Sequence, residues 1–360
     1  MDMTAGLVNA TPPLLAASFD GPKTAATDRT QQADHPISDK RHREELALYP
    51  DAADSTSPGT TRVISYVQTY FPDNGSYVSL LPLYTSSSGI THIILAAFHI
   101  NEDAESITLN DDSPDHTRYG PLWEEVRVLQ GAGIKVMGML GGAARGSFRR
   151  LDGDSFIEYY APLRELIRMR QLDGLDLDVE EEMSLEGIIR LIDALKSDFG
   201  NSFIITLAPV ASAMVRGLQH LSGFNYFHLE EQRGSKISWY NTQFYNGWGG
   251  IQDVTAYETI MSNGWPSEKI VAGVLTNPRN GTQGYVPVEL LNLVFATLCQ
   301  RHPSFGGVSG WEYFNALPGG EEKPWQWAAI MSFIFGMKYL YDTAVVGAFL
   351  MAVNNGPHRN

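Results

Sequence analysis

Cysteine is nearly absent from this chain of 360 residues, in which Cys299 is the only one. A single cysteine excludes an intrachain disulfide and a metal site built from several thiolates. Cys299 lies in the apolar segment LVFATLCQ, where we interpret it as a small buried hydrophobic residue rather than a reactive thiol. The fold must therefore rest on an ordinary hydrophobic core, which a chain of this length can build.

Positive charge is also scarce, with 26 Lys and Arg against 41 Asp and Glu and a net charge of −15. No basic patch is available to neutralise phosphates, so we expect no nucleic-acid partner. Three catalytic motifs are missing from the sequence: the G-x-S-x-G elbow, the phosphate-binding P-loop and the zinc motif H-E-x-x-H. Their absence removes the commonest serine hydrolases, nucleotide hydrolases and zinc proteases from consideration.

Long hydrophobic runs occur only near the C-terminus, in WAAIMSFIFGM and TAVVGAFLMAV, which Lys338 and Asp342 separate. Each run is too short to span a bilayer, so we expect no membrane partner, with a membrane anchor as the alternative. We interpret the first run as the last helix of the domain and residues 336–360 as an apolar extension. The N-terminus lacks a cationic start followed by an apolar core, which favours a cytoplasmic location over secretion.

The chain changes character at Thr61. Residues 1–60 are rich in Ala, Thr, Asp, Ser and Pro without periodicity, which is typical of a disordered tail. Residues 61–335 alternate helical patterns with eight short apolar runs: RVISYV, ITHIILAAFHI, IKVMGML, GLDLDVE, FIITLAPV, NTQFYN, KIVAGVL and GGVSGWEYF. This alternation predicts an α/β fold, a (β/α)8 TIM barrel. A doubly wound sheet is the alternative, but no G-x-G-x-x-G follows the first strand.

The most informative segment is DGLDLDVEEEMS, residues 173–184. Side chains alternate along a strand, so Asp176, Asp178 and Glu180 should share one face and point into the barrel. Crowded, partly buried carboxylates raise the pKa of at least one member, as a general acid requires. Glu180 should close the strand at the barrel mouth and protonate a leaving-group oxygen. A Mg²⁺ or Ca²⁺ site and a purely structural acidic row are weaker alternatives, and Glu181 and Glu182 are expected in a solvated loop.

A second polar group lies in SWYNTQFYN, where Asn241, Gln243 and Tyr245 share parity and should face the barrel interior. Their amides and hydroxyl can donate hydrogen bonds to a polarised carbonyl oxygen or to a sugar hydroxyl. For Asn241, a structural role within the barrel is an equal alternative to contact with a substrate.

Three further features belong to strand ends. Trp311 offers a flat apolar platform on which a sugar ring could stack. Gly141 and Gly142 leave room for a substrate beside the mouth. His99 is interpreted as a hydrogen-bonded residue of the mouth rather than as a metal ligand.

These residues resemble a known family. DGLDLDVE matches the signature D-G-x-D-x-D-x-E of glycoside hydrolase family 18. The segment from Arg62 to Trp327, roughly three quarters of the chain, is similar to fungal endo-β-N-acetylglucosaminidases of that family. The similarity is carried by ILAAFHIN, KVMGMLGGAARGSF, ITLAPVAS, WYNTQFYN and GWEYFNALPGG.

The resemblance implies a retaining mechanism in which the 2-acetamido group of the substrate is the nucleophile. Glu180 would then be the acid and later the base, Asp178 would orient the acetamido N–H, and Asp176 would support Asp178. The remaining residues expected at the substrate are Tyr245, which would bind the acetamido carbonyl, Gln243, Trp311 as the floor, Phe98 and Asn246. We expect a carbohydrate substrate, no metal or cofactor, and a monomer.

The choice of substrate depends on two weaker features. The segment from Thr276 to Phe305 is too short for the insertion domain that deepens many chitinase grooves, and no cysteine-stapled chitin-binding module is present. An open mouth favours cleavage within the chitobiose core of an N-glycan, with chitin hydrolysis as the alternative. An inactive carbohydrate-binding barrel is least favoured, because Asp176, Asp178, Glu180 and Tyr245 are all present.

Overall fold

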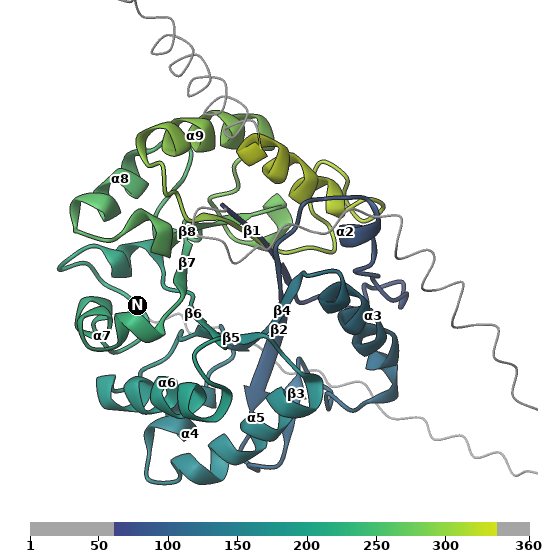
Figure 1. Ribbon diagram of the computed structural model, residues 1–360, viewed down its shortest axis with the longest axis vertical. Coiled ribbons are helices and arrows are strands. Elements are labelled where there is room, and N and C mark those ends of the chain that lie inside the picture. The colour runs from purple at the N-terminus through teal and green to yellow at the C-terminus, as the bar shows by residue number, and fades with distance from the viewer. Residues whose placement is uncertain (1–60, 337–360) are drawn as a thin grey trace, which may run out of the picture. The chain divides into compact units, whose positions relative to one another are not determined.

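The computed structural model describes residues 61–336, which contain a closed barrel of eight parallel strands. The strands follow the order β1-β9-β8-β7-β6-β5-β4-β2, and β2 pairs again with β1. Figure 1 shows the ring of strands at the centre with helices around its outside. The predicted (β/α)8 barrel is therefore confirmed. The predicted disordered tail and residues 337–360 of the apolar extension lie outside the described residues.

The barrel strands are β1 (Arg62–Val67), β2 (His92–Ile100), β4 (Lys135–Gly141), β5 (Gly174–Asp178), β6 (Ile204–Leu207), β7 (Trp239–Gln243), β8 (Ile270–Leu275) and β9 (Gly307–Trp311). The α-helices are α2 (Pro82–Thr85), α3 (Gly120–Gly131), α4 (Ser147–Asp152), α5 (Phe156–Arg170), α6 (Leu185–Phe199), α7 (Tyr226–Arg233), α8 (Thr255–Ser262) and α9 (Val288–Arg301). Residues 325–336 are also helical.

Strand alternation produces two separate hydrophobic cores. One face of each strand packs outward against the helices, and its residues include Leu95, Leu140, Leu175, Leu177 and Leu207. The other face fills the barrel interior with a smaller cluster, comprising Ile64, Tyr66, Ile94, Ala96, Ala97, Met137, Met139, Trp239 and Val271. In β5 the leucines belong to the outer core, so the intervening aspartates project into the barrel.

A β-bulge interrupts this alternation in β2. The pairing of β2 with β4 shifts register between Leu95 and Phe98, and both Ala96 and Ala97 belong to the interior cluster. The extra residue reverses the parity that follows, so Phe98 packs in the outer core and His99 faces the barrel mouth. The strand β3 (Ile107–Leu109), which the sequence did not predict, pairs antiparallel with the end of β2.

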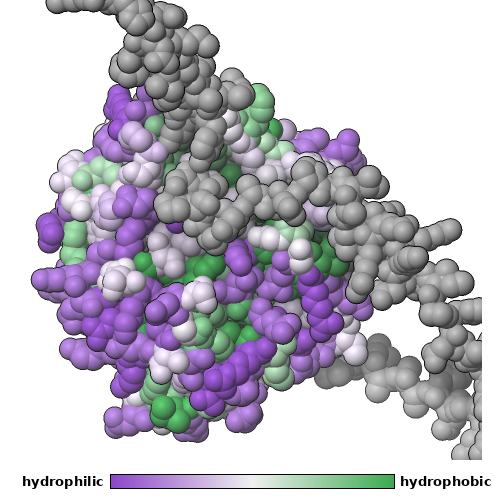
Figure 2. All heavy atoms as spheres, in the orientation of Figure 1, coloured by the Kyte–Doolittle hydropathy of each residue, from purple (hydrophilic) through white to green (hydrophobic). Residues whose placement is uncertain are grey.

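The helix at residues 325–336 completes the ring, with Trp327, Met331 and Phe335 buried against the core. The interpretation of WAAIMSFIFGM as the last helix is thus confirmed as far as residue 336. No helix within residues 61–336 is long and apolar enough to cross a membrane. Hydrophilic residues predominate over the visible surface, with hydrophobic residues in small patches between them (Figure 2).

Candidate active site

Asp176 forms the base of the site and is fully buried. Its Oδ2 accepts a hydrogen bond from the Tyr66 hydroxyl at 2.7 Å, and its Oδ1 accepts one from Thr206 Oγ1 at 2.5 Å. Asn241 Nδ2 donates a further bond to Oδ1 at 3.0 Å. Burial raises the pKa of Asp176, while these three donors oppose the rise. Residues from β1, β5, β6 and β7 therefore converge on one carboxyl group.

Asp178 lies one layer nearer the mouth, at the end of β5. Its Oδ1 accepts a hydrogen bond from Gln243 Nε2 at 3.1 Å. Burial raises the pKa of Asp178 well above the usual value, and the nearby charges of Glu180 and Asp176 raise it further. The hydrogen bond from Gln243 opposes this rise.

Glu180 lies two residues beyond the end of β5, so the prediction that it closes the strand was wrong. Its carboxyl group nevertheless faces the same cavity as Asp178, and Gln243 Nε2 lies 3.4 Å from its Oε1. Burial raises the pKa of Glu180, against the bond from Gln243 and the charge of Arg145. Glu180 is the most accessible of the three carboxyl groups, because Asp176 and Asp178 are buried.

These groups border a cavity of about 360 Å³, which we call the carboxylate pocket. Its lining brings together eight of the predicted residues: Gly141, Gly142, Asp178, Glu180, Gln243, Tyr245, Asn246 and Trp311. The Tyr245 hydroxyl has no hydrogen-bond partner within residues 61–336, and burial raises its pKa well above the usual value. Tyr245 therefore stays protonated and presents a free O–H donor to the pocket.

The glycines at the end of β4 are required by the backbone. Gly141 and Gly142 have φ angles of +92° and +89°, which residues with side chains rarely adopt. A Cβ on Gly141 would lie 2.7 Å from the Asp178 carbonyl oxygen. The Gly142 N–H donates to that same oxygen at 2.8 Å, so the two strand ends lie in direct contact.

Four predictions need correction or refinement. Phe98 is fully buried in the outer core and cannot contact a substrate, because the β-bulge turns it away from the mouth. Glu181 is buried rather than solvated, whereas Glu182 is exposed as predicted. Asn241 lies below the pocket, where its Oδ1 accepts a bond from Trp239 Nε1 at 2.9 Å, which fits a structural role. His99 lines the mouth, but its buried Nδ1 has no hydrogen-bond partner among the described residues.

Several residues of the site were not predicted. Tyr66 and Thr206 hold Asp176, and Gln68, Ala97, Met139, Ala143 and Ala144 line the carboxylate pocket. A signal for the first two existed, because each is a polar group on the inward parity of an otherwise apolar strand. Ala97, Met139, Ala143 and Ala144 are small or apolar and carry no such signal, and Gln68 lies just beyond the end of β1, where a polar side chain is unremarkable.

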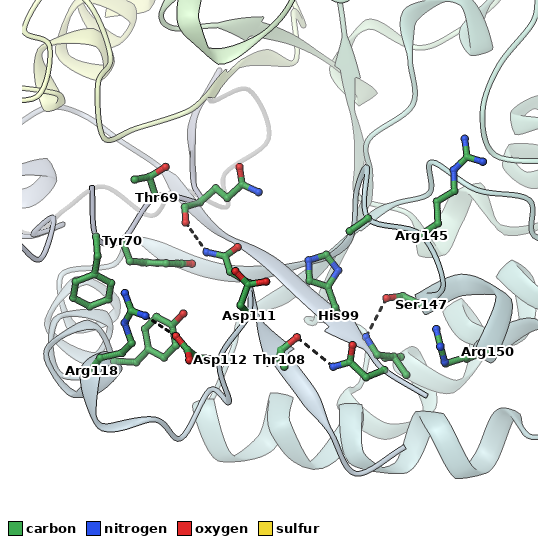
Figure 3. Close-up of a pocket in the computed structure, with 17 residues that line it drawn as sticks. Thr69, Tyr70, His99, Thr108, Asp111, Asp112, Arg118, Arg145, Ser147 and Arg150 are labelled. Carbon is green, nitrogen blue, oxygen red and sulfur yellow. Dashed lines mark hydrogen bonds and ion pairs between the residues drawn. The ribbon is translucent and has the colours of Figure 1, made fainter. Parts of the chain in front are cut away.

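A second and larger cavity of about 940 Å³, which we call the polar pocket, adjoins the first and shares Gln68, His99 and Ala144 with it. Figure 3 shows His99 near its middle, Arg118 and Asp112 on one side, and Arg145 on the other. Arg118 Nη1 pairs with Asp112 at 2.6 Å, whereas Arg145 forms no ion pair within the described residues. The polar pocket thus offers the guanidinium of Arg145 beside the carboxyl groups.

Metal ligation was one alternative for the acidic row. Within residues 61–336, no group of three or more His, Cys, Asp or Glu side chains is arranged to hold a metal ion. The oxygens of Asp176 point instead at three protein donors, and Oδ1 of Asp178 accepts from Gln243. This donor set stabilises carboxyl groups by hydrogen bonding rather than around a common cation.

Comparisons with known proteins agree with this geometry. Residues 62–301 match the family model described as Glycosyl hydrolases family 18. Among solved structures, the chitinase ChiC from Aspergillus fumigatus is 62% identical, with a TM-score of 0.71 and coverage of 76% of this chain and 99% of that chain. A fungal endo-β-N-acetylglucosaminidase of family 18 is 46% identical, with a TM-score of 0.73 and coverage of 76% and 97%.

A curated relative, Chitinase 2 from Rhizopus oligosporus, is 24% identical over 272 residues, which are 67% of this chain and 47% of the relative. The chain thus spans about half the length of that relative. The family model covers more than half of the chain, and its match includes the strand that carries Asp176 and Asp178. The chain therefore belongs to the glycosyl hydrolases of family 18.

Proposed function

We propose that this glycoside hydrolase is an endo-β-N-acetylglucosaminidase, which cleaves the β-1,4 bond in the chitobiose core of N-linked glycans. The observation that carries this choice is the polar pocket beside the carboxylate pocket. A glycan core bears branched arms rich in hydroxyl groups, and a cavity of about 940 Å³ lined by Arg, Asp, Asn and Thr side chains offers them space and hydrogen-bond partners.

The proposed reaction uses the substrate's own acetamido group. Its carbonyl oxygen attacks the anomeric carbon while the glycosidic C–O bond breaks, and Glu180 gives its proton to the departing oxygen. Asp178 accepts the acetamido N–H and stabilises the positive charge of the cyclic intermediate. Glu180 then takes a proton from water, which attacks the anomeric carbon, restores the acetamide and retains the β configuration.

The rest of the carboxylate pocket would position the sugar. The free Tyr245 hydroxyl would donate to the acetamido carbonyl, which keeps its oxygen aimed at the anomeric carbon. Trp311, half-buried with its ring centroid 5.6 Å from that of Tyr66, would carry the apolar face of the same sugar. Asp176 would act through Asp178, since it is sealed beneath the pocket.

Chitin hydrolysis is the second candidate, and the observation that favours it is the 62% identity to a solved chitinase. A linear N-acetylglucosamine polymer presents repeated apolar ring faces, which call for a row of aromatic platforms. The carboxylate pocket has one such platform in Trp311. In the polar pocket Tyr70 and Tyr119 are buried, and the partly exposed Phe71 ring is covered by the Arg118 guanidinium, 4.1 Å from its centroid. This shortage of exposed rings supports the branched substrate over the polymer.

The decisive experiment incubates the purified chain and its Glu180→Gln variant with a mannose-rich N-glycoprotein and, separately, with a chitin hexamer. Release of the glycan with one N-acetylglucosamine left on asparagine, seen by mass and absent in the variant, is the expected result. Cleavage of the hexamer alone would reassign the substrate to chitin. Cleavage of neither would overturn both assignments.

A further inference from the structure

The buried carboxylate of Glu181 joins the loop that follows β4 to the segment that carries Glu180. The N–H of Gly146 donates to both oxygens of Glu181, at 2.8 and 2.9 Å, and the N–H of Phe148 donates to Oε1 at 2.9 Å. Glu181 is 7% exposed, so these charge-assisted bonds form away from water. The side chain next to Glu180 is therefore fully committed to another part of the backbone.

The short helix α4 is fixed to the same segment at its far end. Asp152, the last residue of α4, accepts bonds from Ser184 N at 2.8 Å and Ser184 Oγ at 2.5 Å. Arg190 of α6 donates to the carbonyl oxygens of Leu151 and Asp152, at 3.0 and 2.7 Å. Helix α4 is thus bound to Glu181 through Phe148 in its first turn and to Ser184 through its last residue, Asp152.

The contacts on either side of Glu180 leave its backbone little freedom. Before it, the Asp178 carbonyl accepts from Gly142 at 2.8 Å, and the Val179 carbonyl accepts from Ser222 Oγ at 2.8 Å. After it, Glu181 is held by Gly146 and Phe148. Glu180 itself has one long hydrogen bond from Gln243, so its position depends mainly on its chain neighbours.

We infer that Glu181 is a positioning residue, which holds the backbone of Glu180 against the loop after β4 so that its carboxyl group faces the carboxylate pocket. The same bonds anchor the loop at Gly146, directly after Ala144, which lines both cavities, and Arg145, which lines the polar pocket. Without the Glu181 carboxylate, the N–H groups of Gly146 (part-buried) and Phe148 (buried) lose their acceptor and the loop can move away from β5. The inference rests on the proposed role of Glu180 as the acid.

The test compares Glu181→Ala and Glu181→Gln with Glu182→Ala, which removes the neighbouring exposed carboxylate and serves as the matched control. Glu181→Ala should lower kcat about 10- to 100-fold with a smaller change in KM, because a misplaced acid slows the chemical step more than binding. It should also move the basic limb of the kcat profile against pH, since the surroundings of Glu180 change. Glu181→Gln, which keeps one acceptor oxygen, should recover part of the rate.

A merely structural role would give a different result. Glu181→Ala would then melt at a lower temperature, while its folded fraction would match the wild type and Glu182→Ala in kcat and in pH profile. That outcome overturns the inference. Rates are measured on whichever of the two substrates the wild type cleaves, so a change of substrate does not affect the comparison.

Hydrogen exchange supplies a readout that needs no activity. The amides of residues 143–148 and 179–184 should lose protection in Glu181→Ala and keep it in Glu182→Ala. If the wild type cleaves neither substrate, the proposed function has failed, and exchange still decides whether Glu181 holds the segment. Unchanged protection in Glu181→Ala would overturn the inference whatever the activity.

Discussion

Gln243 Nε2 lies 3.1 Å from Oδ1 of Asp178. The same nitrogen lies 3.4 Å from Glu180 Oε1 and donates to the Ala208 carbonyl at 2.9 Å. One amide group on β7 therefore connects the two carboxyl groups nearest the pocket. Its bonds lower the pKa of each of them, against the rise that burial causes.

Replacing Gln243 by leucine removes this donor while keeping a similar volume. We expect kcat/KM to fall about 10- to 100-fold, because a hydrogen bond to a charged group contributes about 1.5–3 kcal/mol. The acidic limb of the kcat/KM profile should move to higher pH, since Asp178 then binds its proton more tightly. Steady-state kinetics from pH 4 to 9 would check both, and an unmoved limb would contradict the assignment.

Glu180→Gln should reduce kcat about 100- to 10,000-fold, the range that general acid catalysis supplies. The same change removes one of three crowded negative charges, so the melting temperature should stay constant or rise. Calorimetry and kinetics on one preparation would establish both effects. A large drop in melting temperature would mean that Glu180 supports the fold rather than the reaction.

The raised pKa of Asp178 makes stability depend on pH. Its native pKa lies well above that of an unfolded aspartate, about 3.9, so the native state holds the proton more tightly. Its contribution to stability is complete below the unfolded value and is lost as pH rises through the native value. Urea unfolding of Asp178→Asn should therefore show a smaller loss of unfolding free energy between pH 4 and 8 than the wild type. Equal slopes would disprove the shift.

His99 is placed to bind a glycan arm, since its side chain lines both cavities. Burial lowers its pKa, so the neutral ring can accept or donate a bond to a hydroxyl group. His99→Ala should raise KM for the N-glycan about 3- to 10-fold, the effect of one hydrogen bond. His228→Ala, at an exposed position on α7, is the control, and equal KM values would count against the proposed arm site.

Asp173 opens the acidic signature but lies at the opposite end of β5. Its Oδ2 accepts from the Val136 N–H at 2.8 Å and from Gln130 Nε2 at 2.8 Å. Asp173→Ala should cost about 1–3 kcal/mol of unfolding free energy, because a backbone donor loses its partner. The turnover number should not change. Denaturant unfolding and kinetics would test this, with the exposed Asp154→Ala as the reference.

The barrel and its carboxylates could be predicted because both depend on alternation. Leu175 and Leu177 required one buried face, which placed Asp176 and Asp178 on the other. The β-bulge in β2 could not be predicted, since two alanines pack on either face of a strand equally well. Because of that single inserted residue, Phe98, which was expected at the substrate, packs in the outer core, and His99 faces the barrel mouth.

The role of Glu181 was hidden for a different reason. Its carboxylate oxygens accept hydrogen bonds from the backbone N–H groups of Gly146 and Phe148, which lie more than 30 positions earlier in the chain. Backbone donors have no sequence signature, so a run of three glutamates gives no indication of which one is buried. By contrast, Tyr66 and Thr206 were detectable, because a polar side chain on the inward face of a strand needs a partner there.

The last strand has a consequence for the order of assembly. β9 pairs with both β1 and β8, and it carries Trp311 into the carboxylate pocket. A nascent chain that has emerged as far as Leu275 has all three carboxyl groups, but it lacks the proposed sugar platform and the strand that joins β8 to β1. The proposed platform for the sugar therefore appears only with the final strand of the barrel. Premature termination anywhere before Trp311 would leave the carboxyl groups and Tyr245 in an unclosed barrel without the proposed platform.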